Sequence, residues 1–289
     1  MGIRRRSGVL GFLGAQLDFD ECGLVQRGAW DAELPDEATA NGVKKEKVEQ
    51  EEEAVEEEEG TKRSAGLNVL TGCGMMDGTE ISEAISTAIH LYKHNIRPDF
   101  YAPNIDVCAS INHYTGCLES SDIPRNALVE AARIARSCIR PICKCKVCEY
   151  ALLIIPGGAG VIRTLSDFSS AGNDCIVHPE LRNIITEFRT QCKPIGTMCM
   201  ASVLIAKVLP GSTVTLGKTS PKEQWPYASA IEKVKKMGAK VTMQNVHGVT
   251  YCKKHNLYST PAWLDAHANY SDVHEGIGKM IAMIKKNMK

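Results

Sequence analysis

Residues 193–208 read KPIGTMCMASVLIAKV, and this stretch decides the fold. A short apolar run leads into the thiol of Cys199, and small and apolar residues then recur at helical spacing. The pattern predicts a buried strand over 194–198 that turns sharply into a helix over 200–209, with the cysteine at the turn. A strand that runs directly into a helix is typical of α/β proteins.

The position of Cys199 suggests a nucleophile. The partial positive charge at a helix N-terminus lowers the pKa of a nearby thiol and favours the reactive thiolate. The backbone N–H groups of Met200 and Ala201 have no helical partners there and can hold a developing oxyanion. A lone cysteine is also a common core residue, so the motif alone leaves a structural role open.

Strand-like and helix-like segments alternate over the rest of the chain from Gly66 onward. Residues 150–155 form a continuous apolar run, which is typical of a strand covered on both faces. Further strands are expected over 67–70, 100–102, 213–216, 241–243, 246–252 and 257–259, and helices over 125–136, 179–192, 228–237 and 272–287. The alternation predicts one α/β domain over 65–289 with a largely parallel central sheet.

Ligands of such sheets bind at the carboxyl ends of the strands. Three loops are expected to meet there, after Leu70, after Ile155 and around Cys199. Glu80 and Glu83 open the helix that follows the first loop and, three residues apart, share one helical face. Either carboxyl can hydrogen-bond the thiol and move protons, or both can simply stabilise the helix dipole. Placement in the first turn, nearest the strand ends, favours Glu80 as the partner of the thiol.

Asp77 or Thr79 is expected to cap this helix. Its apolar residues form one stripe, as in a helix that packs against a sheet. The stripe consists of Ile81, Ala84, Ile85, Ala88, Ile89 and Tyr92. In the second loop, Gly157 and Gly158 allow the backbone to approach a ligand, and their N–H groups can face an oxyanion. A plain tight turn is the alternative for the two glycines.

The charge of the chain is unevenly distributed. Residues 1–64 hold 9 Lys and Arg against 16 Asp and Glu, whereas the remainder holds 25 against 18. A glutamate-rich block over 46–59 lacks an apolar stripe and is interpreted as a disordered, solvated linker, with an acidic interaction tail as the alternative. The positive excess of the remainder is spread out, so nucleic-acid binding is not indicated. No run of 18 apolar residues predicts a membrane span.

The first seventeen residues resemble an organelle transit peptide. They contain Arg4, Arg5 and Arg6 and a following apolar segment, with no acid before Asp18. An Arg-rich, acid-free amphipathic start is typical of such peptides. We therefore expect a mitochondrial location, with a cytoplasmic one as the alternative.

The chain has twelve cysteines, and we expect them to be reduced because no secretory signal peptide is evident. Four of them, Cys138, Cys143, Cys145 and Cys148, lie close together in sequence. The C-x2-C pair at 145–148 has the spacing of zinc ligands, but no second pair completes a familiar site. We therefore expect incidental thiols and no metal, with zinc as the alternative.

Several segments together resemble a known family. They are Gly72–Gly74, Asp77–Ile81, Ala131–Arg136, Pro156–Gly158, Lys193–Gly196, Trp225–Ala228, Thr260–Ala262 and Glu275–Gly278. In this order, from about residue 66 to the C-terminus, they resemble the class I glutamine amidotransferase-like superfamily, in the branch of PfpI-type peptidases and the parkinsonism-associated deglycase. The most similar subgroup holds bacterial glyoxalase ElbB and the animal mitochondrial glutamine amidotransferase-like class 1 domain proteins.

The resemblance implies a flavodoxin-like three-layer sandwich, a nucleophilic Cys199, an acidic partner at Glu80 or Glu83, and a homodimer. It also implies glyoxalase or deglycase chemistry on small α-oxoaldehydes, with no metal or organic cofactor. In that chemistry the thiol adds to the aldehyde, the acid moves a proton between adjacent carbons, and hydrolysis releases a hydroxy acid. True amidotransferases need a Cys-His-Glu triad, and no histidine directly follows Cys199.

Two residues depart from the family pattern. Lys218 stands where related proteins carry a histidine, and Ser202 stands where they carry a proline after the nucleophile. These departures leave a catalytically inactive paralogue as one alternative. A non-enzymatic redox sensor or chaperone-like protein is another, because a helix-terminal thiolate oxidises readily.

Overall fold

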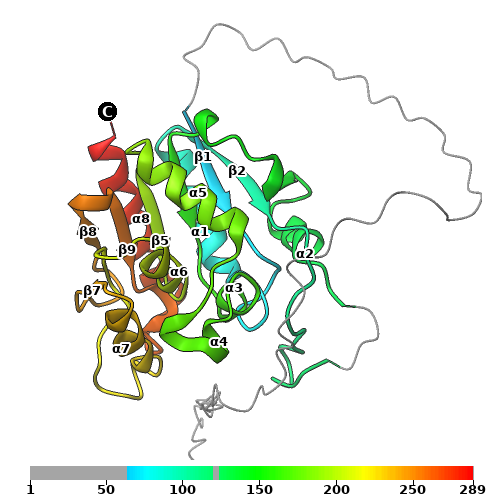
Figure 1. Ribbon diagram of the computed structural model, residues 1–289, viewed down its shortest axis with the longest axis vertical. Coiled ribbons are helices and arrows are strands. Elements are labelled where there is room, and N and C mark those ends of the chain that lie inside the picture. Colours follow the sequence, from blue (N-terminus) through cyan, green and yellow to red (C-terminus); the bar gives the residue numbers. More distant parts are fainter. Residues whose placement is uncertain (1–63, 120–123, 289) are drawn as a thin grey trace, which may run out of the picture.

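A seven-stranded sheet runs through the middle of the computed structural model (Figure 1), which describes residues 64–119 and 124–288. The predicted transit peptide and acidic linker lie outside the described residues, apart from Ser64. The strand order is β3 (Ile139–Pro141), β2 (Ile96–Ala102), β1 (Ser64–Val69), β4 (Leu152–Ile155), β5 (Ile195–Met198), β9 (Leu257–Thr260) and β8 (Thr250–Cys252). All neighbouring strands are parallel except β8 and β9.

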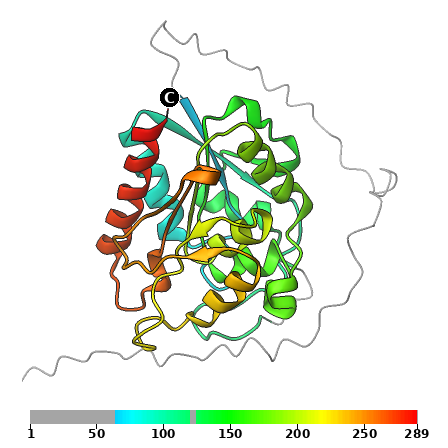
Figure 2. The same ribbon diagram turned by 60° about the vertical axis from the view of Figure 1, so that its left-hand side comes forward.

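Helices cover both faces of this sheet, which gives three layers (Figure 2). On one face α1 (Ile81–Lys93) packs against α8 (Tyr270–Asn287), and on the other α5 (Pro179–Thr190) packs against α6 (Ala201–Val208). The remaining helices are α2 (Ala127–Ile134), α3 (Ala159–Thr164), α4 (Phe168–Ala171) and α7 (Ser229–Lys236). The flavodoxin-like sandwich expected from the sequence is confirmed.

Some strand expectations need correction. The segments at 213–216 and 241–243 contribute only β6 (Thr213–Val214) and β7 (Lys240–Val241), which pair in a separate small sheet. β3 was not expected, because three residues that end in a proline carry no apolar run. By contrast, β4 matches its continuous apolar run, and all four of its residues are fully buried between the helical layers.

The predicted orientation of α1 is wrong. Most of its apolar stripe faces outward: Ile81, Ile85, Ile89 and Tyr92 are between 40% and 55% exposed. The helix instead buries Glu83, Ala84, Thr87 and Leu91. It is capped by Glu80, whose carboxylate accepts a hydrogen bond from the N–H of Glu83, rather than by Asp77 or Thr79. Contacts with the sheet and α8 therefore override the apolar pattern and place a carboxyl group in the interior.

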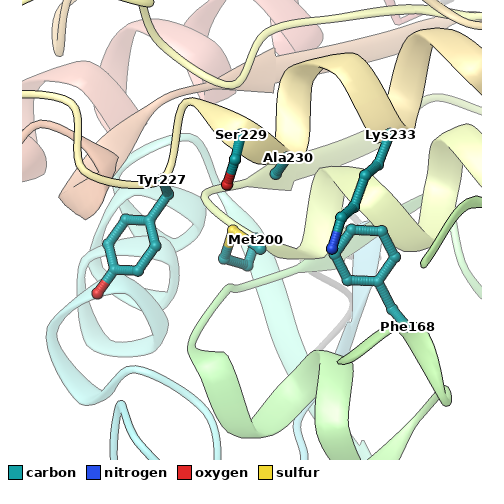
Figure 3. Close-up of a pocket in the computed structure, with 6 residues that line it drawn as sticks. All are labelled: Phe168, Met200, Tyr227, Ser229, Ala230 and Lys233. Carbon is teal, nitrogen blue, oxygen red and sulfur yellow. The ribbon is translucent and has the colours of Figure 1, made fainter. Parts of the chain in front are cut away.

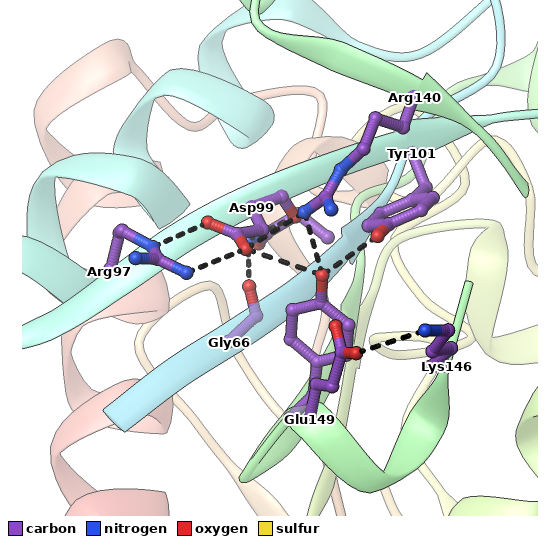
Figure 4. Close-up of polar contacts among 9 residues, drawn as sticks. Gly66, Arg97, Asp99, Tyr101, Arg140, Lys146 and Glu149 are labelled. Atoms are coloured by element: carbon purple, nitrogen blue, oxygen red, sulfur yellow. Dashed lines mark hydrogen bonds and ion pairs between the residues drawn. The ribbon is translucent and has the colours of Figure 1, made fainter. Parts of the chain in front are cut away.

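A cluster of polar side chains, which we call the edge network, joins β2, β3 and the segment just before β4 (Figure 4). It consists of Asp99, Tyr101, Arg140 and Tyr150. The Tyr150 hydroxyl lies 2.9 Å from that of Tyr101 and accepts a hydrogen bond of the same length from Arg140. Arg140 also pairs with Asp99 at 3.1 Å and stacks over the ring of Tyr101. Each polar group of the network has a partner.

Candidate active site

Cys199 occupies the sharp turn that the sequence predicts between β5 and α6. Its φ angle is +52°, a left-handed conformation that is uncommon for a residue with a side chain. Its N–H donates to the carbonyl of Thr260 at 3.1 Å, which ties the turn to the neighbouring strand β9. Such backbone strain is concentrated at functional sites, and this turn is the geometry of a nucleophile elbow. The residue is only 6% exposed.

Glu83, in the first turn of α1, lies beside Cys199 where the loops after β1, β4 and β5 converge. The Oε2 atom of Glu83 accepts a hydrogen bond from the Gly157 N–H at 2.7 Å. A Cβ atom built on Gly157 would lie 2.5 Å from the Cys199 Cβ and 2.9 Å from this Oε2. Only glycine therefore fits between the acid and the thiol. The residues predicted to meet at the carboxyl ends of β1, β4 and β5 do meet there.

The buried carboxyl of Glu83 is unusually basic. Burial, followed by the charge of Glu80, raises its pKa to about 8. Donor groups at Gly157, Trp263 and Cys199 act in the opposite direction but are outweighed. Its Oε1 atom is buried and has no hydrogen-bond partner among the described residues. At neutral pH the group therefore holds a proton, and a carboxylic acid can donate that proton to a neighbouring atom.

The preference for Glu80 as the acid beside the thiol is corrected by this geometry. The Oε2 atom of Glu80 accepts hydrogen bonds from the Glu83 N–H and the Ser82 hydroxyl, both at 2.7 Å. Glu80 therefore closes the first turn of α1, while the side chain of Glu83 points inward. Glu80 still affects the site, because its negative charge favours the neutral form of Glu83.

The pKa of the Cys199 thiol is raised well above its ordinary value, contrary to the lowered pKa predicted from the helix N-terminus. Burial is the largest cause and the Glu83 charge the next. The backbone N–H groups of Met200 and Gly158 lower the pKa, as expected of donors near the sulfur, but do not outweigh burial. When Glu83 is protonated its contribution disappears, so the titrations of the two groups are coupled, and at neutral pH both the carboxyl and the thiol hold their protons.

Two of the four predicted backbone donors lie near the sulfur. Gly158 and Met200 both act on the pKa of the thiol as hydrogen-bond donors. The N–H of Gly157 is instead occupied by the Glu83 carboxyl. The pair formed by Gly158 and Met200 is therefore the oxyanion-binding element that the site offers.

A pocket beside Met200 was not predicted from the sequence. Its lining consists of Phe168, Met200, Tyr227, Ser229, Ala230 and Lys233 (Figure 3). Burial raises the pKa of the Tyr227 phenol, the charge of Cys199 raises it further, and Arg163 lowers it. Tyr227 lies in the Trp225–Ala228 segment that carried the family resemblance, which was the only signal in the sequence.

Of the two residues that depart from the family pattern, Ser202 lies one turn after Cys199, and its N–H donates to the Cys199 carbonyl at 3.3 Å. Lys218 is exposed after β6, and Ser202 is buried in α6 with no partner for its hydroxyl in the described part of the chain. Within residues 64–119 and 124–288, no three His, Cys, Asp or Glu side chains are grouped so that they could hold a metal ion. No helix in these ranges has the length and apolar character needed to cross a bilayer.

The sandwich fold, the strained cysteine between β5 and α6, and the buried acid define an amidotransferase-like α/β protein. No family model matches the chain. A solved protein from Ehrlichia chaffeensis, described as an isoprenoid biosynthesis protein with an amidotransferase-like domain, has a similar structure. Its TM-score is 0.70 at 28% identity, over 78% of this chain and all of that one.

Two relatives with similar sequences show which family within this class the chain belongs to. The mitochondrial ES1 protein homolog of Rattus norvegicus is 38% identical over 219 residues, which are 75% of this chain and 80% of the relative. The human mitochondrial glutamine amidotransferase-like class 1 domain-containing protein 3 is 37% identical over 217 residues, with the same coverage. The chain belongs to this ES1 family of glutamine amidotransferase-like class 1 domain proteins, as the sequence predicted. The names of the relatives also support the predicted mitochondrial location.

Proposed function

We propose that the protein is a glyoxalase or deglycase-type enzyme that converts small α-oxoaldehydes into 2-hydroxy acids. The observation that carries the proposal is the Glu83 carboxyl, which is fully buried, protonated at neutral pH and hydrogen-bonded by the Cys199 thiol. A group that moves protons to and from a substrate needs a pKa near the working pH and a position beside the nucleophile, and Glu83 has both.

The chemistry needs one nucleophile and one acid–base group. As the Cys199 sulfur adds to the aldehyde carbon, the thiol releases its proton to water and the Glu83 carboxyl donates its proton to the carbonyl oxygen, which gives a hemithioacetal and leaves Glu83 as the carboxylate. Glu83 then removes the proton from that carbon and delivers it to the neighbouring carbon, while the hydroxyl proton moves to the neighbouring oxygen, which gives a 2-hydroxy thioester. Water cleaves the C–S bond, the thiol and Glu83 each regain a proton, and the hydroxy acid leaves.

Two further groups support this sequence. The N–H groups of Gly158 and Met200, next to the sulfur, can stabilise negative oxygen in the adduct and in the hydrolysis step. The overall reaction adds one water and changes no net oxidation state. It therefore needs no external oxidant or reductant, and since the family resemblance implies no metal, EDTA should leave the rate unchanged.

Incubation of the full chain with methylglyoxal, followed by quantification of lactate, tests the proposal. The wild type should form lactate, and Cys199→Ser should lose at least about a thousandfold in kcat/KM. Cys192→Ser, which removes an exposed thiol, is the matched control and should keep its activity. Absence of lactate with the wild type, or equal activity of Cys199→Ser, contradicts the proposal and favours an inactive paralogue.

A redox sensor is the second candidate, and the site gives it little support. A sensor cysteine is exposed and has a low pKa, whereas Cys199 is buried and its pKa is raised. Intact-mass and peptide mapping after mild peroxide treatment distinguishes the two. Selective oxidation of Cys199 over the exposed thiols favours the sensor, and preferential oxidation of exposed thiols such as Cys192 argues against it.

We also propose the homodimer that the family resemblance implies, with the outward stripe of α1 as the contact surface. Exposed apolar side chains gathered on one helix mark interaction sites in soluble proteins. The stripe is formed by Ile81, Ile85, Ile89 and Tyr92. Light scattering should report a dimer for the wild type and a monomer for Ile85→Glu. Val129→Glu, an equally apolar exposed position on α2, is the control and should remain dimeric. A monomeric wild type, or a dimeric Ile85→Glu, contradicts this assignment.

A further inference from the structure

The loop that follows β9 contacts both partners of the proposed chemistry. The carbonyl of Thr260, the last residue of β9, accepts a hydrogen bond from the Cys199 N–H at 3.1 Å. Further along the loop, the backbone of Trp263 acts on the Glu83 carboxyl as a hydrogen-bond donor. Between them Ala262 has a φ angle of +49°, which is uncommon for a residue with a side chain. A strained backbone therefore brings Trp263 to the acid while Thr260 holds the nucleophile.

The indole of Trp263 begins a chain of hydrogen bonds that has a fixed direction. Its Nε1 atom donates to the Ser82 hydroxyl at 2.7 Å. An indole N–H can only donate, so the Ser82 oxygen accepts, and the single proton of the hydroxyl is left for another acceptor. That acceptor is the Oε2 atom of Glu80, also at 2.7 Å. The chain therefore runs from Trp263 through Ser82 to Glu80 and cannot be reversed.

The carboxylate at the end of this chain is held in one place. The same Oε2 atom of Glu80 accepts a second hydrogen bond, from the Glu83 N–H at 2.7 Å. Two donors on one carboxylate oxygen hold the group firmly against the first turn of α1, because hydrogen bonds to an ionised acceptor are strong. After burial, the charge of Glu80 is the largest cause of the raised pKa of Glu83. The position of this carboxylate therefore affects how tightly Glu83 keeps its proton.

The ring of Trp263 is itself fixed by packing. It is half-buried and packs against the hydrophobic core. It also meets the ring of Tyr270, the first residue of α8, edge to face, with ring centroids 5.0 Å apart and an interplanar angle of 80°. Such aromatic pairs are favourable beyond the area that they bury. The indole therefore connects the start of α1 with the start of α8, and its N–H meets Ser82 in a defined geometry.

We propose that Trp263 is a positioning residue for the acid of the site. Its indole N–H and the Ser82 hydroxyl together hold the Glu80 carboxylate in place at the start of α1. Trp263 thus acts through its neighbours rather than on the substrate. The titratable groups that act on Glu83 are Glu80 from its own helix and Cys199 from the turn after β5. The effect on catalysis rests on the proposed function, whereas the positioning of Glu80 does not.

Urea denaturation of the full chain tests the positioning without turnover. The free energy of unfolding is measured from pH 4.5 to above pH 8, with Glu83 and with Glu83→Gln, and the pH dependence of the difference gives the pKa of Glu83. Trp263→Phe keeps an aromatic ring but removes the donor, and Ser82→Ala removes the next bond of the chain. In both variants Glu80 is held less firmly and repels Glu83 less, so the pKa of Glu83 should fall by roughly 0.5. In a Glu80→Gln background, Trp263→Phe should cause no further change in this pKa.

Ser86→Ala is the matched control. The Ser86 hydroxyl lies one turn further along α1, 3.1 Å from Nδ1 of His274 rather than beside a carboxylate, so its loss should leave the pKa of Glu83 unchanged. A loss of stability that is equal at every pH in Trp263→Phe and Ser82→Ala would show a purely structural role and overturn the proposal. If Trp263→Phe does not fold, the result for Ser82→Ala decides. A wild type that forms no lactate, although both variants lower the pKa, contradicts only the proposed function.

Discussion

Two polar clusters in this protein contain buried groups that are paired in different ways. In the edge network of Asp99, Tyr101, Arg140 and Tyr150, each polar group meets a partner, and burial raises the pKa of both tyrosines without leaving a group unpaired. In the site, burial raises the pKa of both Glu83 and Cys199, yet Oε1 of Glu83 has no partner among the described residues. Loss of solvation thus accompanies a fully paired, stabilising cluster in the edge network, and a pair of groups suited to proton transfer at Glu83 and Cys199.

The largest expected effect is on kcat, which should fall when the site is changed but not when the edge network is changed. Glu83→Gln keeps the size of the side chain but cannot exchange a proton, so it should lower kcat about 10²–10⁴-fold in the lactate assay. Tyr150→Phe removes a hydroxyl from the edge network and should leave kcat within about twofold. A Glu83→Gln variant as active as the wild type, or an inactive Tyr150→Phe that is still folded, would contradict the comparison.

The next effect is on the pH dependence of stability. The pKa of Glu83 is raised from 4.5 to about 8 by folding, so between these values the folded state binds a proton that the unfolded state has lost. This group therefore reduces the free energy of unfolding progressively as pH rises from 4.5 to 8, by up to about 5 kcal/mol. Urea denaturation across this range should show Glu83→Gln gaining stability relative to the wild type as pH rises. A difference that does not change with pH would refute the raised pKa.

The edge network should affect stability more than chemistry. Tyr150→Phe leaves the buried Tyr101 hydroxyl without its partner, which should cost about 1–3 kcal/mol in the free energy of unfolding, whereas the half-exposed Arg140 side chain keeps its ion pair with Asp99. Tyr114→Phe, at a fully exposed tyrosine, is the control and should be neutral. Equal denaturation midpoints for the two variants would show that the network does not stabilise the fold.

The smallest effect concerns Glu80. Because its charge raises the pKa of Glu83, Glu80→Gln should lower that pKa and move the acid–base transition in the pH–rate profile to lower pH. Because glutamine keeps one oxygen that can accept from the Glu83 N–H, the weakened helix cap should cost less than about 1 kcal/mol, while kcat at its optimum changes little. If this transition moves to higher pH, or if activity falls as much as in Glu83→Gln, Glu80 rather than Glu83 would be the acid of the site.

The sequence predicted those features that are local in the chain. The apolar run before Cys199 and the helical spacing after it indicated β5, the turn and α6 within a few residues. The glycines at 157 and 158 indicated a close backbone approach, because no other residue permits it, and Gly157 does lie against the Cys199 Cβ. The order of family segments indicated the sandwich and the subgroup.

The face of α1 could not be predicted in this way. Two stripes run along the helix at similar spacing, and the more apolar one, with Ile85 and Ile89, is the one that faces outward. The choice of buried face depends on contacts with α8 and with the loop of Gly157, which lie far away in sequence. The preference for Glu80 over Glu83 failed for the same reason.

The sequence by itself determined that the chain folds as an α/β sandwich with a cysteine at a strained turn, because hydrophobic period and glycine geometry are local properties. Only the tertiary structure decided that Glu83 rather than Glu80 faces the thiol, and that the pKa values of both groups rise. The physical reason is that solvation depends on everything packed around a group. The residues that surround Glu83 and Cys199 come from α1, the loop after β4, the turn after β5 and the segment of Trp263.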